Sequence, residues 1–273
     1  MKKSLFYIIV FFALQVFALA VAWVGNLLVN GAGSRFSVTW AIVMQMVFTL
    51  SCIVLFLWRR WTPFELQRTR QQKGGILVWA VVAALGTIIP SMWLQEQLTF
   101  LPDLASKEIL SIIHHPLGYL VIGILAPLSE EVVFRGAILR ELLGWFHERS
   151  SHSSPLTPPP YTSWIAICVS ALFFAAAHMN PAQMPHAFLL GLLLGWLYWR
   201  SGSILPGVVV HVANNTVMFI LARSYPYMDD LTIEQLLGGS QRHLFMAIGF
   251  SFCLLLPALF QIHERMPHRK RVG

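Results

Sequence analysis

The sequence predicts an all-α membrane protein, a polytopic transmembrane helical bundle of about eight spans. Of its 273 residues 56% are hydrophobic and 11% are charged, and the mean hydropathy is +0.65, whereas soluble domains carry about 25% charged residues. Uncharged stretches repeatedly reach the roughly 20 residues that cross a hydrocarbon core. Because these stretches lack the two-residue alternation of barrel strands, helices are expected to satisfy their backbone in lipid.

Apolar segments follow one another along the chain, and each has the length of a membrane helix or nearly so. The predicted spans are residues 5–24, 38–58, 76–94, 116–145, 163–179, 184–199, 204–222 and 244–261. No repeat or change of composition divides the chain, so we expect a single membrane domain over residues 1–273. Spans four to seven carry nearly all the polar groups that lie within the predicted helices.

Lys and Arg residues are distributed unevenly between the predicted loops. If the N-terminus is cytoplasmic, the inner segments hold fourteen of these residues and the outer segments hold four. The positive-inside rule expects this excess, so both termini are predicted to be cytoplasmic. The net charge of +7 is then a topology signal, and nucleic acid is not an expected partner.

The fourth span carries two carboxylates and a guanidinium within an apolar run, and each charge costs at least about 2.5–3.5 kcal/mol near the centre of a membrane helix. Glu131 and Arg135 stand at i and i+4 with the acid first, so they can neutralise one another on one face. Glu130 points about 100° away. We predict that Glu130 faces a polar cavity and accepts a proton from water. The alternative, solvated charges at an interfacial helix end, is disfavoured because apolar residues continue to Leu143.

Two later spans contribute further polar groups. The fifth ends with Phe174 and His178, and the seventh places His211 and Asn215 on one face, one helical turn apart. Taken singly, such residues usually join helices by hydrogen bonds. Together with a carboxylate they form a set that can activate water and stabilise the oxyanion formed when an amide is attacked. The combination favours peptide hydrolysis.

The sixth span offers two weaker features. Gly191 and Gly195 form a small-residue pair that lets another helix approach closely, so we predict internal packing there. His186 lies near the start of this span. We attribute it to solvation at the membrane interface and leave it out of the candidate site.

In the same order along the chain, three patterns resemble the motifs of the CAAX-protease and bacteriocin-processing family of intramembrane proteases, which includes type II CAAX prenyl endopeptidases. They are Glu130-Glu131-xxx-Arg135, Phe174-xxx-His178 and His211-xxx-Asn215, within a motif-bearing core at 116–222. The resemblance implies an endopeptidase that cleaves a membrane-associated or CAAX-type protein or peptide. It also implies roles: Glu130 activates water with help from His178, and His211 and Asn215 hold the oxyanion. Glu131 and Arg135 complete the catalytic set.

The resemblance leaves the metal question open, since this family is often labelled metalloprotease. Glu130, His178 and His211 could bind zinc and leave a fourth position for water. The chain lacks the HExxH motif, and these ligands would come from three separate helices. A metal-free mechanism with glutamate-activated water is therefore favoured.

Two other functions stay open. An ion- or proton-coupled transporter also places Glu, Arg and His within membrane helices. Inverted-repeat transporters, however, show matching broken helices in both halves, whereas these polar residues occupy only the later half. A non-catalytic membrane scaffold would keep the same contacts without turnover. Nothing in the sequence indicates the substrate's identity, its prenylation or an oligomeric state.

Overall fold

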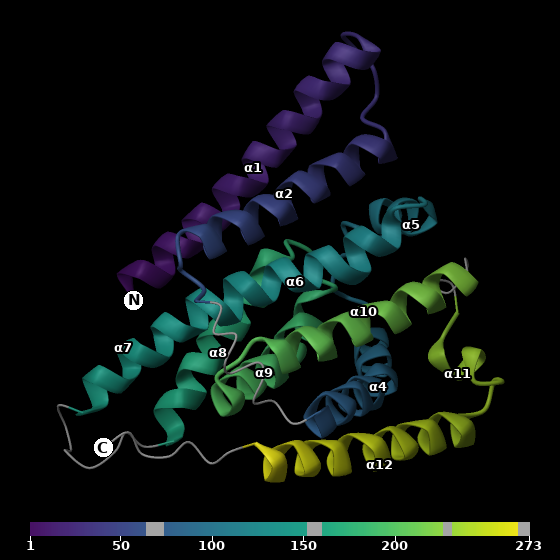
Figure 1. The fold of residues 1–273 in the computed structure, drawn as a ribbon. Helices are drawn as coiled ribbons and strands as arrows, with labels where there is room; N and C mark the ends of the chain where they lie inside the picture. Colours follow the sequence, from purple (N-terminus) through teal and green to yellow (C-terminus); the bar gives the residue numbers. More distant parts are fainter. Residues whose placement is uncertain (64–73, 152–159, 226–230, 267–273) are drawn as a thin grey trace. The chain divides into compact units, whose positions relative to one another are not determined.

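The computed structural model describes residues 1–63, 74–151, 160–225 and 231–266 (Figure 1). Within these ranges the secondary structure is helical and contains no strand, which confirms the all-α prediction. The chain forms two compact units. Unit 1 comprises Met1–Phe64 and Ala105–Ala166, and unit 2 comprises Glu65–Leu104 and Ile167–Gly273. Several basic residues behind the topology prediction, in 64–73 and 267–273, lie outside the described residues.

All eight predicted spans are helical, and the second has the predicted bounds. The helices are α1 (Lys2–Asn30), α2 (Val38–Trp58), α4 (Gly74–Gln97), α5 (Ser106–His114), η1 (Tyr119–Leu125), α6 (Ala126–Glu130), η2 (Glu131–Leu139), α7 (Arg140–Ser151), α8 (Pro160–Ala177), α9 (Met184–Ser201), α10 (Leu205–Ser224), α11 (Ile233–Leu236) and α12 (Gln241–Arg265). Of these, η1 and η2 are π-helices. The short helices α5 and α11 were not predicted.

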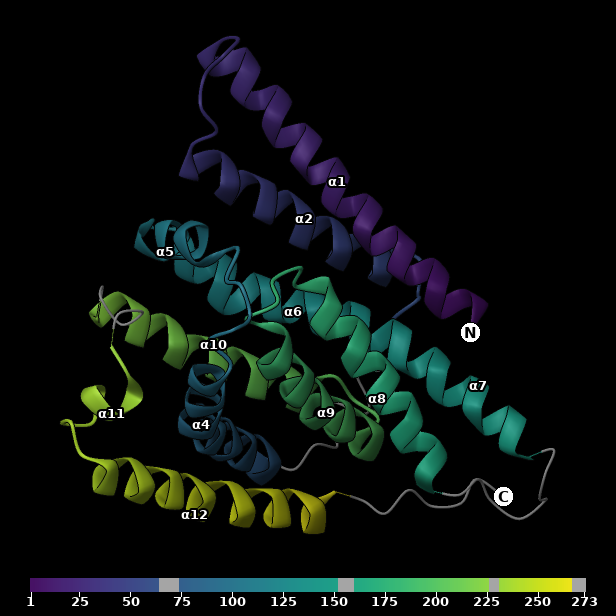
Figure 2. The ribbon, with the colours of Figure 1, turned by 180° about the vertical axis from the view of Figure 1, so that it is seen from behind.

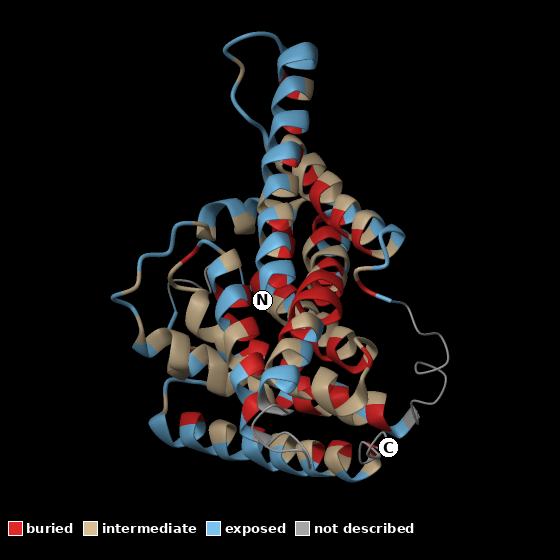
Figure 3. Cartoon of the chain, turned by 90° about the vertical axis from the view of Figure 1, so that its left-hand side faces the viewer, coloured by how far each residue is buried: buried red, intermediate tan, exposed pale blue. Residues whose placement is uncertain are grey.

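Fewer than eight of these helices qualify as membrane spans on their own. Among the described residues α1, α2, α4, α10 and α12 are long and apolar enough, and α5 with the stretch Tyr119–Arg149, bent by 110°, adds a sixth if the pair is one span. The expected number of eight is therefore approximate. Figure 3 shows α1 largely exposed, and apolar side chains such as Val16 and Phe250 are 67% and 65% exposed. Such surfaces are suited to lipid, and the chain is an integral membrane protein.

In unit 1, α1 and α2 run side by side and both pack against η2. Phe11 of α1 makes edge-to-face ring contacts with Phe48 of α2 and Phe134 of η2, at centroid distances of 5.0 and 5.2 Å. Aromatic pairs of this geometry add stability beyond the area that they bury. All residues of η2 are buried, so the helix that carries the first motif lies in the core of this unit.

In unit 2, α4 packs against α12 and α10 (Figure 2). Small residues on α4, including Ala80, Ala83 and Ala84, are completely buried in the core of this unit. At Gly86 the helices are so close that a Cβ would lie 2.8 Å from the backbone nitrogen of Leu255. This close packing follows the general rule for membrane helices, whose interfaces favour small residues.

Candidate functional site

The helix that carries the first motif changes geometry within it. The α-helix α6 ends at Glu130, and the π-helix η2 begins at Glu131. In a π-helix each N–H bonds the carbonyl five residues back, and such segments are rare and frequently found at functional sites. This change could not be predicted from the sequence, because an i,i+4 pattern is compatible with ordinary α-helix.

Glu131 and Arg135 form the predicted ion pair. Arg135 Nη1 donates to Glu131 Oε1 at 2.8 Å, and the two side chains are 1% and 0% exposed. Because each charge lies away from water, the partner is needed to offset its desolvation. A pair that is fully buried and mutually neutralised is suited to holding the helix rather than to contacting a substrate.

Glu130 differs from its neighbour in exposure. Its side chain is half-buried, whereas Glu131 is inaccessible. Within unit 1 its charge acts on Arg135 and on Cys52 of α2. Of the two carboxylates in this motif, Glu130 is thus the more exposed.

His178 follows the end of α8, in unit 2. Its Nδ1–H donates to the carbonyl of Phe174 at 2.9 Å. In a neutral imidazole this bond leaves Nε2 as the acceptor. The local backbone therefore prepares His178 to take a proton from a molecule placed at Nε2.

Phe174 brings the second and third motifs together within unit 2. Its ring packs edge-on against His178 at 5.0 Å and against His211 of α10 at 5.7 Å. Helix α9 approaches this ring at Gly191. A Cβ added there would lie 2.9 Å from the Ala171 Cβ and 3.3 Å from the Phe174 ring. The close packing predicted at Gly191 is therefore confirmed, and it holds the aromatic ring that both histidines contact.

The third motif includes an amide that the sequence did not single out. His211 and Asn214 are buried, and Asn215 is half-buried. Asn214 Nδ2 donates to Asn215 Oδ1 at 3.4 Å. Since this contact uses the carbonyl oxygen of Asn215, it favours an orientation in which the Asn215 amino group is the donor for other partners.

His186 is influenced by the other histidines of unit 2. It is half-buried at the start of α9, and the charges of His178 and His211 both act on it. The interpretation of His186 as a solvated interfacial residue was therefore incomplete. A usable signal was its position just after the short connection that follows His178, because a tight turn keeps both of its ends near each other.

Neither unit provides a metal site by itself. Throughout the described ranges, no group of three or more His, Cys, Asp or Glu side chains is placed to hold a metal ion. The histidines of unit 2 are arranged around Phe174 rather than converging as the three protein ligands of a catalytic zinc do.

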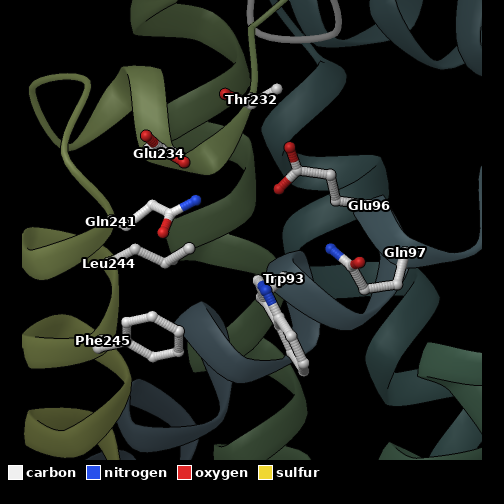
Figure 4. Close-up of a pocket in the computed structure, with 8 residues that line it drawn as sticks. All are labelled: Trp93, Glu96, Gln97, Thr232, Glu234, Gln241, Leu244 and Phe245. Carbon is white, nitrogen blue, oxygen red and sulfur yellow. The ribbon is translucent and has the colours of Figure 1, made fainter.

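A cavity of about 260 Å³ lies in another part of unit 2, between the end of α4 and the start of α12 (Figure 4). It is lined by Trp93, Glu96, Gln97, Thr232, Glu234, Gln241, Leu244 and Phe245. Glu96 Oε2 accepts the Ile233 N–H at 3.3 Å and so ties α11 to α4. None of the predicted site residues lines this cavity.

Comparisons with known proteins agree with the motifs. Residues 112–217 match the family model described as type II CAAX prenyl endopeptidase Rce1-like, and this range contains all of the predicted site residues. A protein of Escherichia coli, described as an uncharacterized 24.3 kDa protein, is 30% identical over 178 residues, which are 62% of this chain and 73% of that protein. No solved structure matches the chain.

The protein is an integral membrane protein whose described residues are helical, with a buried ion pair and a cluster of histidine and amide side chains. The family match places it in a class of membrane proteases. The chain belongs to the Rce1-like family of type II CAAX prenyl endopeptidases.

Proposed function

We propose that this protein is an intramembrane endopeptidase that hydrolyses a peptide bond in a membrane-associated or CAAX-type protein or peptide. The observation that supports this most strongly is the contrast between adjacent carboxylates: Glu131 is sealed in an ion pair, and Glu130 is half-buried. A protein that used both only for structure would have no need to leave one accessible within a membrane helix, where charge is costly.

In the proposed reaction Glu130 is the general base. It takes a proton from water while the water oxygen bonds to the carbonyl carbon of the substrate. The carbon–nitrogen bond then breaks, and the proton passes to the departing nitrogen, which leaves as an amine. His178 assists this proton transfer through Nε2, the nitrogen that its bond to the Phe174 carbonyl leaves as an acceptor.

His211 and Asn215 are proposed to stabilise the oxyanion of the tetrahedral intermediate. Both carry N–H donors, and donors fixed before the reaction lower its barrier because they need no reorganisation. The contact from Asn214 to Asn215 Oδ1 supports this role, since it uses the carbonyl side of the Asn215 amide and leaves the amino side as the donor. Glu131 and Arg135 take part indirectly, by holding η2.

We also propose that both termini are cytoplasmic, as the positive-inside rule predicts. Reporters fused after Lys73, Arg149 and Gly273 should then report cytoplasm, and fusions near Gly33, Lys107 and Asp230 the opposite side. A reversed result at Arg149 would show that the predicted orientation of the span with the first motif is wrong.

The function is tested by incubating purified protein, reconstituted in vesicles, with a library of membrane peptides and identifying new peptide ends by mass spectrometry. Cleavage by the natural sequence and none by Glu130→Ala is the expected result. Ion flux that depends on Glu130 without cleavage would instead indicate a transporter. A folded protein with neither activity would indicate a scaffold.

A further inference from the structure

A side-chain hydroxyl from outside the first motif forms a hydrogen bond with the π-helix η2, one residue after the ion-paired Glu131. Thr62 Oγ1 donates to the Val132 carbonyl at 2.6 Å, across 70 positions of sequence. Thr62 is 3% exposed and Val132 is 2% exposed. Both belong to unit 1, so this bond joins the turn after α2 to the second residue of η2.

This bond acts where α and π geometry compete. In an α-helix the Val132 carbonyl would accept from Gly136, whereas the π pattern assigns it the N–H of Ala137. Thr62 supplies an additional donor to this carbonyl and also fills the space beside Gly136. A Cβ on Gly136 would collide with the Thr62 methyl group and lie 2.6 Å from its hydroxyl oxygen.

The turn that presents Thr62 is itself firmly held. Arg60 adopts the left-handed conformation, with φ 54°, and the N–H groups of Trp61 and Thr62 both bond the Phe56 carbonyl, at 3.0 and 3.2 Å. The Trp61 ring packs on Phe56 at 5.0 Å and on Tyr7 at 5.1 Å. The hydroxyl therefore meets η2 from a fixed position.

We infer that Thr62 is a positioning residue for the proposed peptidase reaction, because its hydroxyl fixes the π register of η2 and so the direction of Glu130. This inference rests on the proposed function. A return to α geometry shifts the pairing by one residue, which turns the segments on either side of η2 relative to one another by roughly 100°. Glu130, the last residue before η2, would then point in a different direction relative to the buried ion pair.

The test compares Thr62→Val, which keeps the shape and removes the hydroxyl, with Thr62→Ser, which keeps the hydroxyl. Thr49→Val is the matched control, because Thr49 is completely buried in the same unit but donates to the Gln45 carbonyl of its own helix, at 2.8 Å. Steady-state kinetics are measured in vesicles on a peptide that the natural sequence cleaves. Hydrogen exchange of η2 amides and the melting temperature are recorded on the same samples.

For Thr62→Val we expect kcat to fall about tenfold or more, as for a misplaced catalytic group, with KM nearly unchanged and faster exchange in η2. Thr62→Ser should recover most of kcat, and Thr49→Val should match the natural sequence. An unchanged kcat in Thr62→Val, or equal losses in all three variants, would overturn the inference. If Thr62→Val does not fold, a loss of kcat in folded Thr62→Ser overturns it, and normal turnover supports it. No cleavage by the natural sequence would reject the proposed function instead.

Discussion

The two units hold their buried polar groups in different ways. In unit 1 the charges of Glu131 and Arg135 neutralise each other at 2.8 Å in complete burial. In unit 2 the polar groups of His178 and Asn214 are held by bonds to a backbone carbonyl and to a neighbouring amide, and Phe174 packs between helices beside two imidazoles. A buried charge needs its own partner nearby, whereas neutral groups can be held by packing. Loss of one group should therefore harm unit 1 more than unit 2.

A second comparison lies within unit 1, between adjacent carboxylates. Glu130 and Glu131 share a helix and a chemistry but differ in exposure. We assign reaction chemistry to the first and structural support to the second. Replacing each by glutamine separates these roles, because the amide keeps the volume and removes the charge.

The largest expected effect is on activity in Glu130→Gln. We expect turnover to fall by about 10²–10⁴-fold, the usual contribution of a general base. The melting temperature and folded yield should stay close to those of the natural sequence, since Glu130 is not the partner in the buried pair. Peptide cleavage and thermal unfolding are measured on the same preparation. Retained turnover would reject the role of Glu130 as base.

Glu131→Gln and Arg135→Leu should act on stability instead. Each removes the 2.8 Å partner of a buried charge, a loss that generally costs about 3–5 kcal/mol, so the folded yield and melting temperature should both fall. Replacing both by leucine removes the two charges together and should recover part of the loss. Normal yield in both single variants would contradict the importance of the ion pair.

In unit 2 a smaller effect is expected from Phe174→Leu. The replacement keeps an apolar side chain but removes the ring that both histidines contact, at a cost of about 1 kcal/mol in stability. Turnover should fall more than stability does, because His178 and His211 lose their common packing partner. Phe173→Leu is the control, since Phe173 is the adjacent residue and is 37% exposed. Equal behaviour of the two variants would show that the ring does not organise the histidines.

Features that depend on residues close together in the chain could be predicted from the sequence, and features that depend on distant residues could not. The Glu131–Arg135 pair was predictable because its partners are four residues apart, and the structure confirms it. Likewise the second span was predicted with the bounds of α2, since a long apolar run reveals itself locally. The bond from Thr62 to Val132 was not predictable, because it joins residues 70 positions apart. The π geometry of η2 also escaped prediction, since hydrophobic spacing does not separate it from α-helix in so short a segment.

Helix α5 was missed for a related reason. Its residues Ser106–His114 lie beside a long apolar run, and the prediction placed only one span there, starting at residue 116. The structure bends the chain by 110° between α5 and the following helix. At this bend a Cβ on Gly118 would collide with the Ile112 carbonyl oxygen, so a close approach that only glycine permits decides the path of the chain.

Metal removal should have the smallest effect. A zinc enzyme loses activity when the ion is stripped and regains it on addition of zinc, whereas glutamate-activated water needs no ion. Within the described residues neither unit alone offers three suitable ligands, and His178 uses Nδ1 to bond the Phe174 carbonyl, leaving Nε2 for proton transfer. We therefore expect substoichiometric zinc and most of the activity to remain after dialysis against a strong chelator. Because a buried ion exchanges slowly in detergent, elemental analysis must accompany each activity measurement. One zinc per chain, lost in step with activity, would contradict the metal-free mechanism and make Glu130, His178 and His211 the ligands to mutate first.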